Sequence, residues 1–168
     1  MFRTLSIFFI FLLLNVSSVS SSNFNYGSGY AAKSVLASQS LINAMDKVDN
    51  RIYAVGEHGI ILYSDDFGDS WTQAESVPYT STLTDISCSS KQSCWVTGHD
   101  ATILHSNDHG VTWIKQYEDP GWDAPLLSIH MFDDKVGIAI GAFALSLRTV
   151  DGGQSWGYLS LDDDEFQP

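Results

Sequence analysis

Basic residues are scarce in this chain, which has 8 lysines and arginines against 20 aspartates and glutamates, for a formal net charge of -12 at pH 7. Nucleic acids and anionic lipid surfaces are bound through clusters of lysine and arginine. The sequence has no such cluster, which excludes nucleic acid as an expected partner. Solubility outside the cytoplasm explains the acidity more simply than an acid-specific partner does.

Cysteine is rarer still, since Cys88 and Cys94 are the only two and no CxxC spacing occurs. Two thiols without clustered histidines make a poor zinc site, so we expect neither a metal nor a cofactor. The two cysteines flank the short segment 89–93, and in a hairpin their Cβ atoms would face each other at bridging distance. We therefore expect a structural disulfide in an oxidising compartment.

No apolar run is long enough to span a bilayer comfortably, because a spanning helix needs about 20 such residues. The longest run, about residues 5–14, follows Arg3 and precedes a series of serines. This order is typical of a secretory signal peptide, with a retained membrane anchor as the alternative. We expect residues 1–22 to be a signal peptide, residues 23–37 an N-terminal extension, and the protein to be exported into the periplasm or secreted.

Helical periodicity is missing after this segment, and the chain instead repeats one pattern three times. The pattern is Ser or Thr, any residue, Asp, any, Gly, any, Ser or Thr, Trp. Its main positions are filled by Ser64, Asp66, Gly68 and Trp71, by Ser106, Asp108, Gly110 and Trp113, and by Thr149, Asp151, Gly153 and Trp156. The carboxylate can accept backbone N–H groups and close a turn, the glycine permits positive φ, and the tryptophan can bury a large ring between sheets.

Short apolar runs surround each of these boxes. Two runs separated by three residues precede each box and predict a hairpin, an earlier run predicts a first strand, and the residues after each tryptophan predict a fourth. Four antiparallel strands in about 42 residues match the size of a propeller blade. We predict an all-β fold, a β-propeller with about three blades at residues 38–77, 80–119 and 124–161. A β-solenoid is the rival, but its coils are normally shorter.

These residues resemble the propeller proteins with BNR or Asp-box repeats, and more closely the photosystem II stability and assembly factors. The stretch 55–64 with its box is similar to that family's VGxxGxIxxSxDGGxTW signature, and so is 141–156. The likeness extends over about residues 38–160. Phe67 and His109 replace a glycine that often precedes the box glycine, and 142–144 lacks the usual glycine of the hairpin turn.

The resemblance implies a non-enzymatic scaffold that binds a membrane or envelope protein complex and assists its assembly or function. It does not by itself imply a photosynthetic role, because one fold supports many functions. Three blades cannot close a ring, which usually has 4 to 8. We therefore expect residues 162–168, an acidic end, to lead toward missing blades in a fragment or truncated gene product. The alternative is self-association, in which two copies cover their open blades in a six-bladed ring.

Asp boxes also occur in sialidases and other glycoside hydrolases, so an enzyme must be considered. A sialidase needs clustered arginines and a tyrosine nucleophile, yet only Arg51 and Arg148 follow the signal segment. Glu57, Asp100 and Asp123 lie in predicted loops where two carboxylates could act, although solvated loop acids are the simpler interpretation. We expect no catalytic residue, and a secreted carbohydrate-binding or hydrolase module remains the alternative function.

The loops opposite the boxes are the expected partner-binding surface. The candidate residues on these loops are Glu57, His58, His99, Asp100, Trp122 and Phe143. Trp122 lies in the segment 119–125, with turn residues on both sides, where an exposed aromatic side chain can anchor a partner. Packing of Trp122 beneath the loop is the alternative.

Overall fold

The computed structural model describes residues 29–159 of the chain. The expected signal peptide, part of the N-terminal extension and the acidic end at 162–168 lie outside the described residues. Residues 29–159 form three four-stranded antiparallel sheets and two short 3-10 turns. No helix in this range has the length and hydropathy needed to cross a membrane. The fold is therefore all-β, as the sequence predicts.

Each sheet is a meander whose strands follow one another in chain order, and we call the sheets blades 1, 2 and 3. Blade 1 contains β1 (Ile42–Val48), β2 (Arg51–Gly56), β3 (Ile61–Ser64) and β4 (Thr72–Gln73). Blade 2 contains β5 (Leu83–Cys88), β6 (Cys94–Gly98), β7 (Ile103–Ser106) and β8 (Ile114–Tyr117). Blade 3 contains β9 (Leu126–Met131), β10 (Gly137–Gly141), β11 (Ser146–Thr149) and β12 (Gly157–Tyr158). The 3-10 turns are η1 (Ala37–Gln39) and η2 (Glu57–Gly59).

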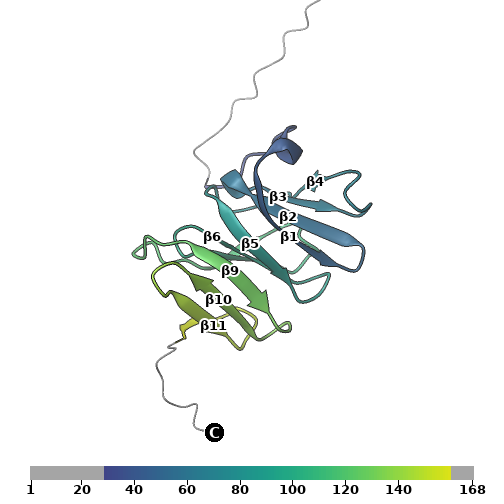
Figure 1. Ribbon diagram of the computed structural model, residues 1–168. Coiled ribbons are helices and arrows are strands. Elements are labelled where there is room, and N and C mark those ends of the chain that lie inside the picture. The colour runs from purple at the N-terminus through teal and green to yellow at the C-terminus, as the bar shows by residue number, and fades with distance from the viewer. Residues whose placement is uncertain (1–28, 160–168) are drawn as a thin grey trace, which may run out of the picture.

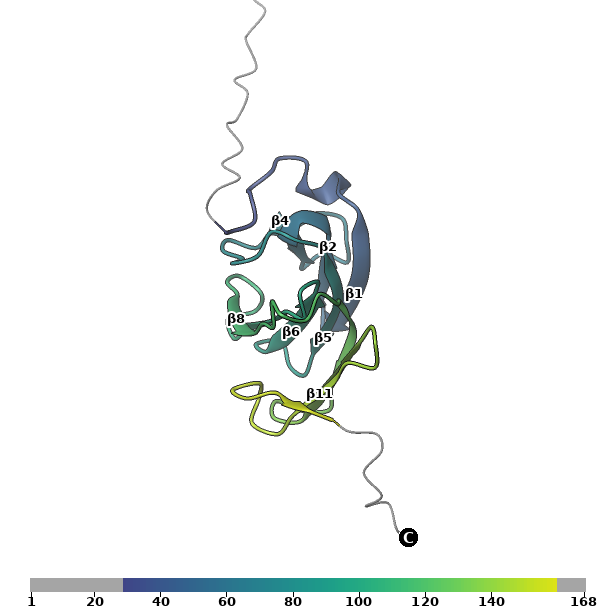
Figure 2. The same cartoon turned by 90° about the vertical axis from the view of Figure 1, so that its left-hand side faces the viewer.

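The blades stack face to face, with the first strands β1, β5 and β9 next to one another (Figures 1 and 2). This arrangement is a partial β-propeller. We call the face of a blade that is directed toward the following blade its trailing face, and the opposite face its leading face. Each interface between blades therefore joins a trailing face to a leading face.

A bulge in the pairing of each first strand leaves one residue unpaired, at Asn43, Thr84 and Leu127. The side chains of Asn43 and Thr84 use this position to reach the next blade. Asn43 Nδ2 donates to the carbonyl of Leu83 over 2.7 Å, and Thr84 Oγ1 donates to the carbonyl of Leu126 over 2.6 Å. The bulge thus links neighbouring first strands that share no sheet hydrogen bonds.

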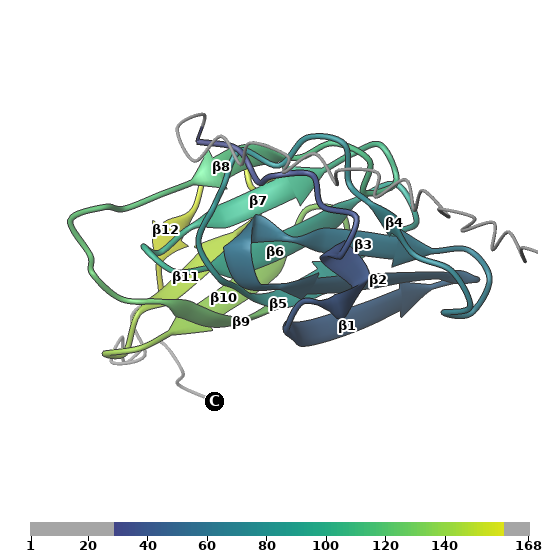
Figure 3. The same cartoon turned by 90° about the horizontal axis from the view of Figure 1, so that it is seen from above.

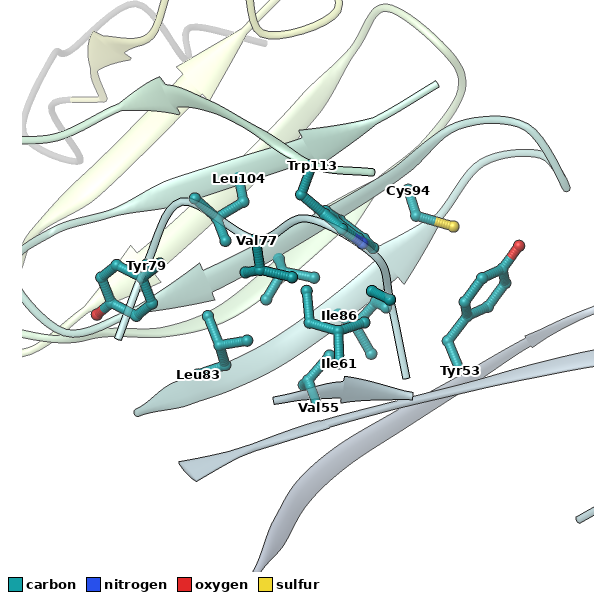
Figure 4. Packing of buried hydrophobic residues seen from close by; sticks show 12 residues of the cluster. Tyr53, Val55, Ile61, Val77, Tyr79, Leu83, Ile86, Cys94, Leu104 and Trp113 are labelled. Atoms are coloured by element: carbon teal, nitrogen blue, oxygen red, sulfur yellow. The ribbon is translucent and has the colours of Figure 1, made fainter. Parts of the chain in front are cut away.

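Two apolar clusters fill the interfaces between the blades. In the first, Tyr53, Val55 and Ile61 of blade 1 pack against blade 2 (Figure 4). Their partners are Val77 and Tyr79 of the linker between the blades and Leu83, Ile86, Leu104 and Trp113 of blade 2. In the second, Trp95 and Ile103 of blade 2 pack against Ile129, Ala139 and Leu147 of blade 3. Burial of these side chains is the main stabilising contribution to the stack.

Each Asp box closes the turn between the third and fourth strands of its blade. In box 1, Asp66 Oδ1 accepts hydrogen bonds from Ser64 Oγ at 2.7 Å and Ser70 N at 2.9 Å, and Oδ2 accepts from Ser70 Oγ. Gly68 N donates to Ser64 Oγ over 2.8 Å. Boxes 2 and 3 repeat all four bonds, and no distance changes by more than 0.1 Å. The turn is thus held by its own side chains.

The box glycines have positive φ, and in blades 2 and 3 they also lie against the preceding blade. A Cβ on Gly110 would lie 2.6 Å from Cε1 of Tyr53, and one on Gly153 would lie 2.0 Å from Oε1 of Gln116. Trp113 is buried beside this contact and donates its indole N–H to the Gly110 carbonyl over 3.0 Å. The box therefore packs against the preceding blade as well as closing its own turn.

The other two box tryptophans are placed differently. Trp156 is half-buried against the cluster between blades 2 and 3. Trp71 packs on the leading face of blade 1, beside Ala54 and Leu62, where no described sheet precedes it. The sequence pattern suggested that each ring lies between two sheets, and Trp71 departs from this because blade 1 is the first of the row.

The expected disulfide is present between Cys88 and Cys94. The two residues are direct partners across β5 and β6, with Cα atoms 4.0 Å apart. The disulfide closes the 89–93 turn of blade 2.

Interblade burial predicts a sharp contrast between two isoleucines of blade 2. Ile103 is fully buried between blades 2 and 3, whereas Ile114 on β8 is exposed. We expect Ile103→Ala to lower the free energy of unfolding by about 2–5 kcal/mol because it leaves a cavity. Ile114→Ala should change it by less than about 0.5 kcal/mol. Urea unfolding of both variants measures this, and equal losses would contradict the packing described.

The box carboxylates predict acid sensitivity. Hydrogen bonds from Ser70, then Ser64, hold the pKa of Asp66 at about 2, below its unfolded value of ~3.9. The stability that these bonds contribute is complete above ~pH 4 and is lost as the pH falls toward 2. We expect Asp66→Asn to lower the urea midpoint at pH 6 and to flatten its fall between pH 4 and 2. Asp123→Asn, at an exposed acid outside the boxes, is the control and should leave both unchanged.

Candidate binding site at the loop end of the blades

The loops between second and third strands and the linkers between blades lie at one end of the molecule, which we call the loop end. The Asp boxes lie at the other, the box end. Figure 3 shows the long connection between β8 and β9 projecting at left, at the loop end. One backbone hydrogen bond recurs in all three blades and ties each hairpin loop to the residue immediately before the first strand of its blade. These bonds are Glu57 N to Leu41 O, His99 N to Thr82 O and Ala142 N to Pro125 O.

Loops of neighbouring blades are also joined by backbone hydrogen bonds. Gly59 N donates to Ser81 O over 2.8 Å, and Ala101 N donates to Ala124 O over 3.0 Å. Each of these bonds connects the hairpin loop of one blade to the linker that enters the next. The loop end is therefore one continuous surface across three blades.

Each hairpin loop has a non-glycine residue with a left-handed backbone conformation at its tip. His58 has φ 55°, Asp100 has φ 53° and Phe143 has φ 55°. Non-glycine residues adopt this conformation rarely, and such residues are concentrated at functional sites. The Phe143 side chain is 81% exposed, so blade 3 presents a bare aromatic ring at the tip of its loop.

The loop end is acidic. Its three hairpin loops and the two linkers between blades contain no lysine or arginine. Asp100 and Asp123 are exposed there. Glu57 Oε1 accepts a hydrogen bond from Leu41 N at 3.0 Å, and Oε2 lies 3.9 Å from His58 Nε2. The surface thus combines negative charge with an exposed aromatic ring.

Trp122 lies in the β8–β9 connection and is half-buried against the cluster between blades 2 and 3. Its ring centroid is 6.1 Å from that of Tyr158. Asp119 organises this loop, because its carboxylate accepts from Gly121 N at 3.1 Å and from the Tyr158 hydroxyl at 3.2 Å. Part of the indole therefore supports the loop while the rest reaches solvent.

The structure places all six predicted residues at the loop end but does not join their side chains. Glu57 and His58 come from blade 1, His99 and Asp100 from blade 2, Trp122 from the β8–β9 linker and Phe143 from blade 3. Within residues 29–159, no hydrogen bond or ion pair links these side chains from one loop to the next. The described part of the chain has no group of three or more His, Cys, Asp or Glu that could hold a metal ion.

The sequence carried no signal for Tyr79 and Tyr158, which shape this end, and marked Asp119 only as a turn residue of the segment 119–125. Tyr79 supports the blade 2 loop from the linker, because its hydroxyl donates to the His99 carbonyl over 2.9 Å. Asp119 and Tyr158 hold the Trp122 loop. Tyr158 belongs to a two-residue strand, and only the fold brings it beside a loop some 39 positions earlier.

Meander blades that each contain an Asp box, with loops gathered at the opposite end, define a β-propeller of the Asp-box type. The family model for photosynthesis system II assembly factor YCF48 matches residues 73–165, which is more than half of the sequence, and the chain belongs to this family. No curated protein matches the sequence.

Solved structures show the same fold. A structure of YCF48 bound to D1 peptide has 22% identity and a TM-score of 0.62, covering 71% of this chain and 40% of its own. YCF48 from Cyanidioschyzon merolae has 22% identity and a TM-score of 0.61, covering 71% and 37%. The GH74 xyloglucanase of Xanthomonas campestris has 12% identity and a TM-score of 0.55, covering 76% and 24%. The chain thus spans less than half the length of these proteins.

The Asp119 contacts predict a local change in dynamics. We expect Asp119→Ala to speed amide hydrogen exchange in residues 119–124, because the Gly121 N–H and the Tyr158 hydroxyl lose their acceptor. Asp123→Ala, at an exposed carboxylate of the same loop, is the matched control and should leave exchange unchanged. Equal protection in both variants would show that Asp119 does not order this loop.

Proposed function

We propose that this chain is a non-enzymatic, exported scaffold whose loop end binds a peptide segment of a membrane or envelope protein complex and assists its assembly. Membership in the YCF48 assembly-factor family supports the assembly role. A YCF48 structure with a bound D1 peptide supports peptide binding as the mode of recognition. The exposed Phe143 beside acidic loops is the observation on this chain that carries the proposal.

The chemistry of the loop end selects a peptide that is both basic and apolar. The Phe143 ring offers apolar contact area with little side-chain freedom to lose, which favours it as an anchor. Asp100 and Asp123 add negative charge that attracts lysine or arginine on the partner. Binding should therefore weaken as the salt concentration rises.

A scaffold fits this surface better than an enzyme does. Glycoside hydrolysis uses two carboxyl groups held about 5–9.5 Å apart on either side of the bond. Glu57, Asp100 and Asp123 stand on three separate loops, and no shared hydrogen bond orients them. The likeness to the GH74 xyloglucanase concerns the fold alone.

Export is the setting that we propose for this role. The Cys88–Cys94 disulfide suits an oxidising compartment. Residues 1–22 have the charge, apolar run and small residues of a signal peptide. Cell fractionation tests this, since a cytoplasmic pool of the full-length chain would contradict it.

Two phenylalanines at opposite ends make a matched test of the binding surface. Phe143 at the loop end and Phe67 at the box end are 81% and 72% exposed, and both have positive φ. We expect Phe143→Ser to weaken binding to the envelope partner by about tenfold or more, as loss of an anchor residue does. Phe67→Ser should retain binding. Affinity capture from envelope extracts identifies the partner, and titration of its basic, apolar peptides gives the affinity.

Three results would count against this proposal. Equal binding by both variants would remove Phe143 as the anchor. Retention of acidic rather than basic peptides would contradict the charge argument. Binding or cleavage of a glycan array in the absence of any protein partner would support the carbohydrate module instead.

A further inference from the structure

The Asp box of blade 2 is joined to the elements before it by hydrogen bonds that do not depend on pH. From the linker between blades 1 and 2, Glu75 N donates to the Val111 carbonyl over 2.7 Å. From blade 1, the Arg51 guanidinium donates to the His109 carbonyl over 2.8 Å. Backbone amides do not titrate near neutral pH, and a guanidinium keeps its charge throughout this range. Acid therefore leaves these bonds unchanged.

The Asp box of blade 3, residues 149–156, is joined to blade 2 by one amide group. Gln116 Nε2 donates to the Gly152 carbonyl over 3.1 Å. Within residues 29–159, no other hydrogen bond links this box to blade 2 or to the linker that follows it. The indole N–H of Trp156, in the same box, is buried and has no acceptor in this range. The hydrogen bonding between blade 2 and box 3 therefore depends on the Gln116 side chain.

The orientation of the Gln116 amide is fixed by two partners of opposite kind. Trp95 Nε1 donates to Gln116 Oε1 over 3.0 Å, while the Gly152 carbonyl accepts from Nε2. An indole N–H can only donate and a carbonyl can only accept, so the amide oxygen must face Trp95 and the amide nitrogen must face Gly152. The group is also tightly enclosed, because a Cβ on Gly153 would lie 2.0 Å from Oε1.

This orientation also fixes which nitrogen of His105 carries a proton. The second hydrogen of the Gln116 amide is directed at His105 Nδ1, 3.3 Å from Nε2 of Gln116. Nδ1 must therefore accept, so the neutral imidazole carries its proton on Nε2, where Ser93 Oγ lies at 3.5 Å. The imidazole also stacks on Trp95, with ring centroids 4.4 Å apart. The bonds of Gln116 to Trp95, Gly152 and His105 are all satisfied while His105 is neutral.

A proton on Nδ1 of His105 makes this arrangement impossible. With the amide as it stands, the new N–H of the imidazolium faces the amide hydrogens of Gln116, and a buried charge lacks an acceptor. With the amide turned over, its oxygen accepts from His105, but its nitrogen then faces the Trp95 N–H and its oxygen faces the Gly152 carbonyl. The bond to box 3 is lost in this second arrangement. Protonation of His105 thus acts on the contact between two blades.

The charged group that acts on His105 is Asp134, in the turn between β9 and β10 of blade 3. The other neighbours, Ser93, Trp95 and Gln116, do not titrate near neutral pH. Burial lowers the pKa of His105, and the Asp134 carboxylate opposes this by favouring the charged ring. The folded pKa lies below the unfolded value of ~6.5. The stability that depends on neutral His105 is therefore complete above ~pH 6.5 and is lost as the pH falls below it.

We propose that Gln116 and His105 form an acid-sensitive latch, in which uptake of a proton by His105 releases the box end of blade 3 from blade 2. The loop end stays joined, because the bond from Ala101 N to the Ala124 carbonyl there involves backbone groups alone. Blades 1 and 2 also stay joined through Arg51. Acid therefore opens one end of one interface, and this response does not depend on the identity of any partner.

The test measures amide hydrogen exchange of the chain purified as the cell produces it, at pH 7 and pH 5, with correction for the intrinsic effect of pH. Protection of residues 149–156 should fall at least about threefold at pH 5, whereas protection of residues 106–113 should stay the same. His105→Phe keeps a ring on Trp95 but has no proton to gain, so it should abolish the fall. His130→Gln, at an exposed histidine of β9, is the control and should retain it.

Gln116→Glu separates the latch from simple packing, because it should reverse the sign of the pH effect. The new carboxylate can accept from Nδ1 of a protonated His105 and so raises the pKa of that histidine. Protection of residues 149–156 should then rise as the pH falls from 7 to 5. A side chain that only fills space at this position would not reverse the response.

Nitrogen chemical shifts of the labelled protein report the tautomer of His105, and the proton should be on Nε2 at pH 7. A proton on Nδ1 at this pH would overturn the proposal. Equal protection of residues 149–156 at both pH values would do the same. So would a fall that persists in a folded His105→Phe variant, or a Gln116→Glu variant that responds to acid as the unaltered chain does.

Discussion

An Asp-box blade has two apolar faces, and exposing either of them to water costs free energy. The structure therefore depends on packing the trailing face of one blade against the leading face of the next. Tyr53 and Trp95 show this dependence most clearly, since each large ring is buried between two sheets. Hydrogen bonds from side chains to backbone carbonyls then fix the register of the blades at their first strands. The bonds of Asn43 and Thr84 have this role. A blade is therefore one repeat of the sequence, but it needs a neighbouring blade to be stable.

The sequence predicted those parts of the fold whose chemistry is local. The Asp box uses groups within four residues of one another, as in the bonds of Asp66 with Ser64 and Ser70. The strand order within each blade and the Cys88–Cys94 disulfide were predictable for the same reason. The family resemblance was correct because the box residues and their spacing carry it.

Side-chain contacts between strands could not be predicted, because they join residues that no sequence pattern relates. No pattern in the sequence marks His105, yet it stacks on Trp95, its partner across β6 and β7, with ring centroids 4.4 Å apart, and burial lowers its pKa. Arg51 read only as one of few arginines. It pairs with Asp65 and lies 4.4 Å from the centre of the Tyr63 ring. The role of Trp122 stayed open for a similar reason, since it depends on a tyrosine in another strand.

Every described sheet pairs only strands that are consecutive in the chain. Blade formation therefore closes short loops, which makes each blade quick to form once its residues are available. During synthesis residues 29–41 and blade 1 are complete before blade 2 exists, so Ala37 can pack on Ala54, Ile60 and Leu62 of the leading face first. The exposed surface is then always the trailing face of the newest blade. The risk of aggregation consequently moves along the nascent chain with that face rather than remaining at one site.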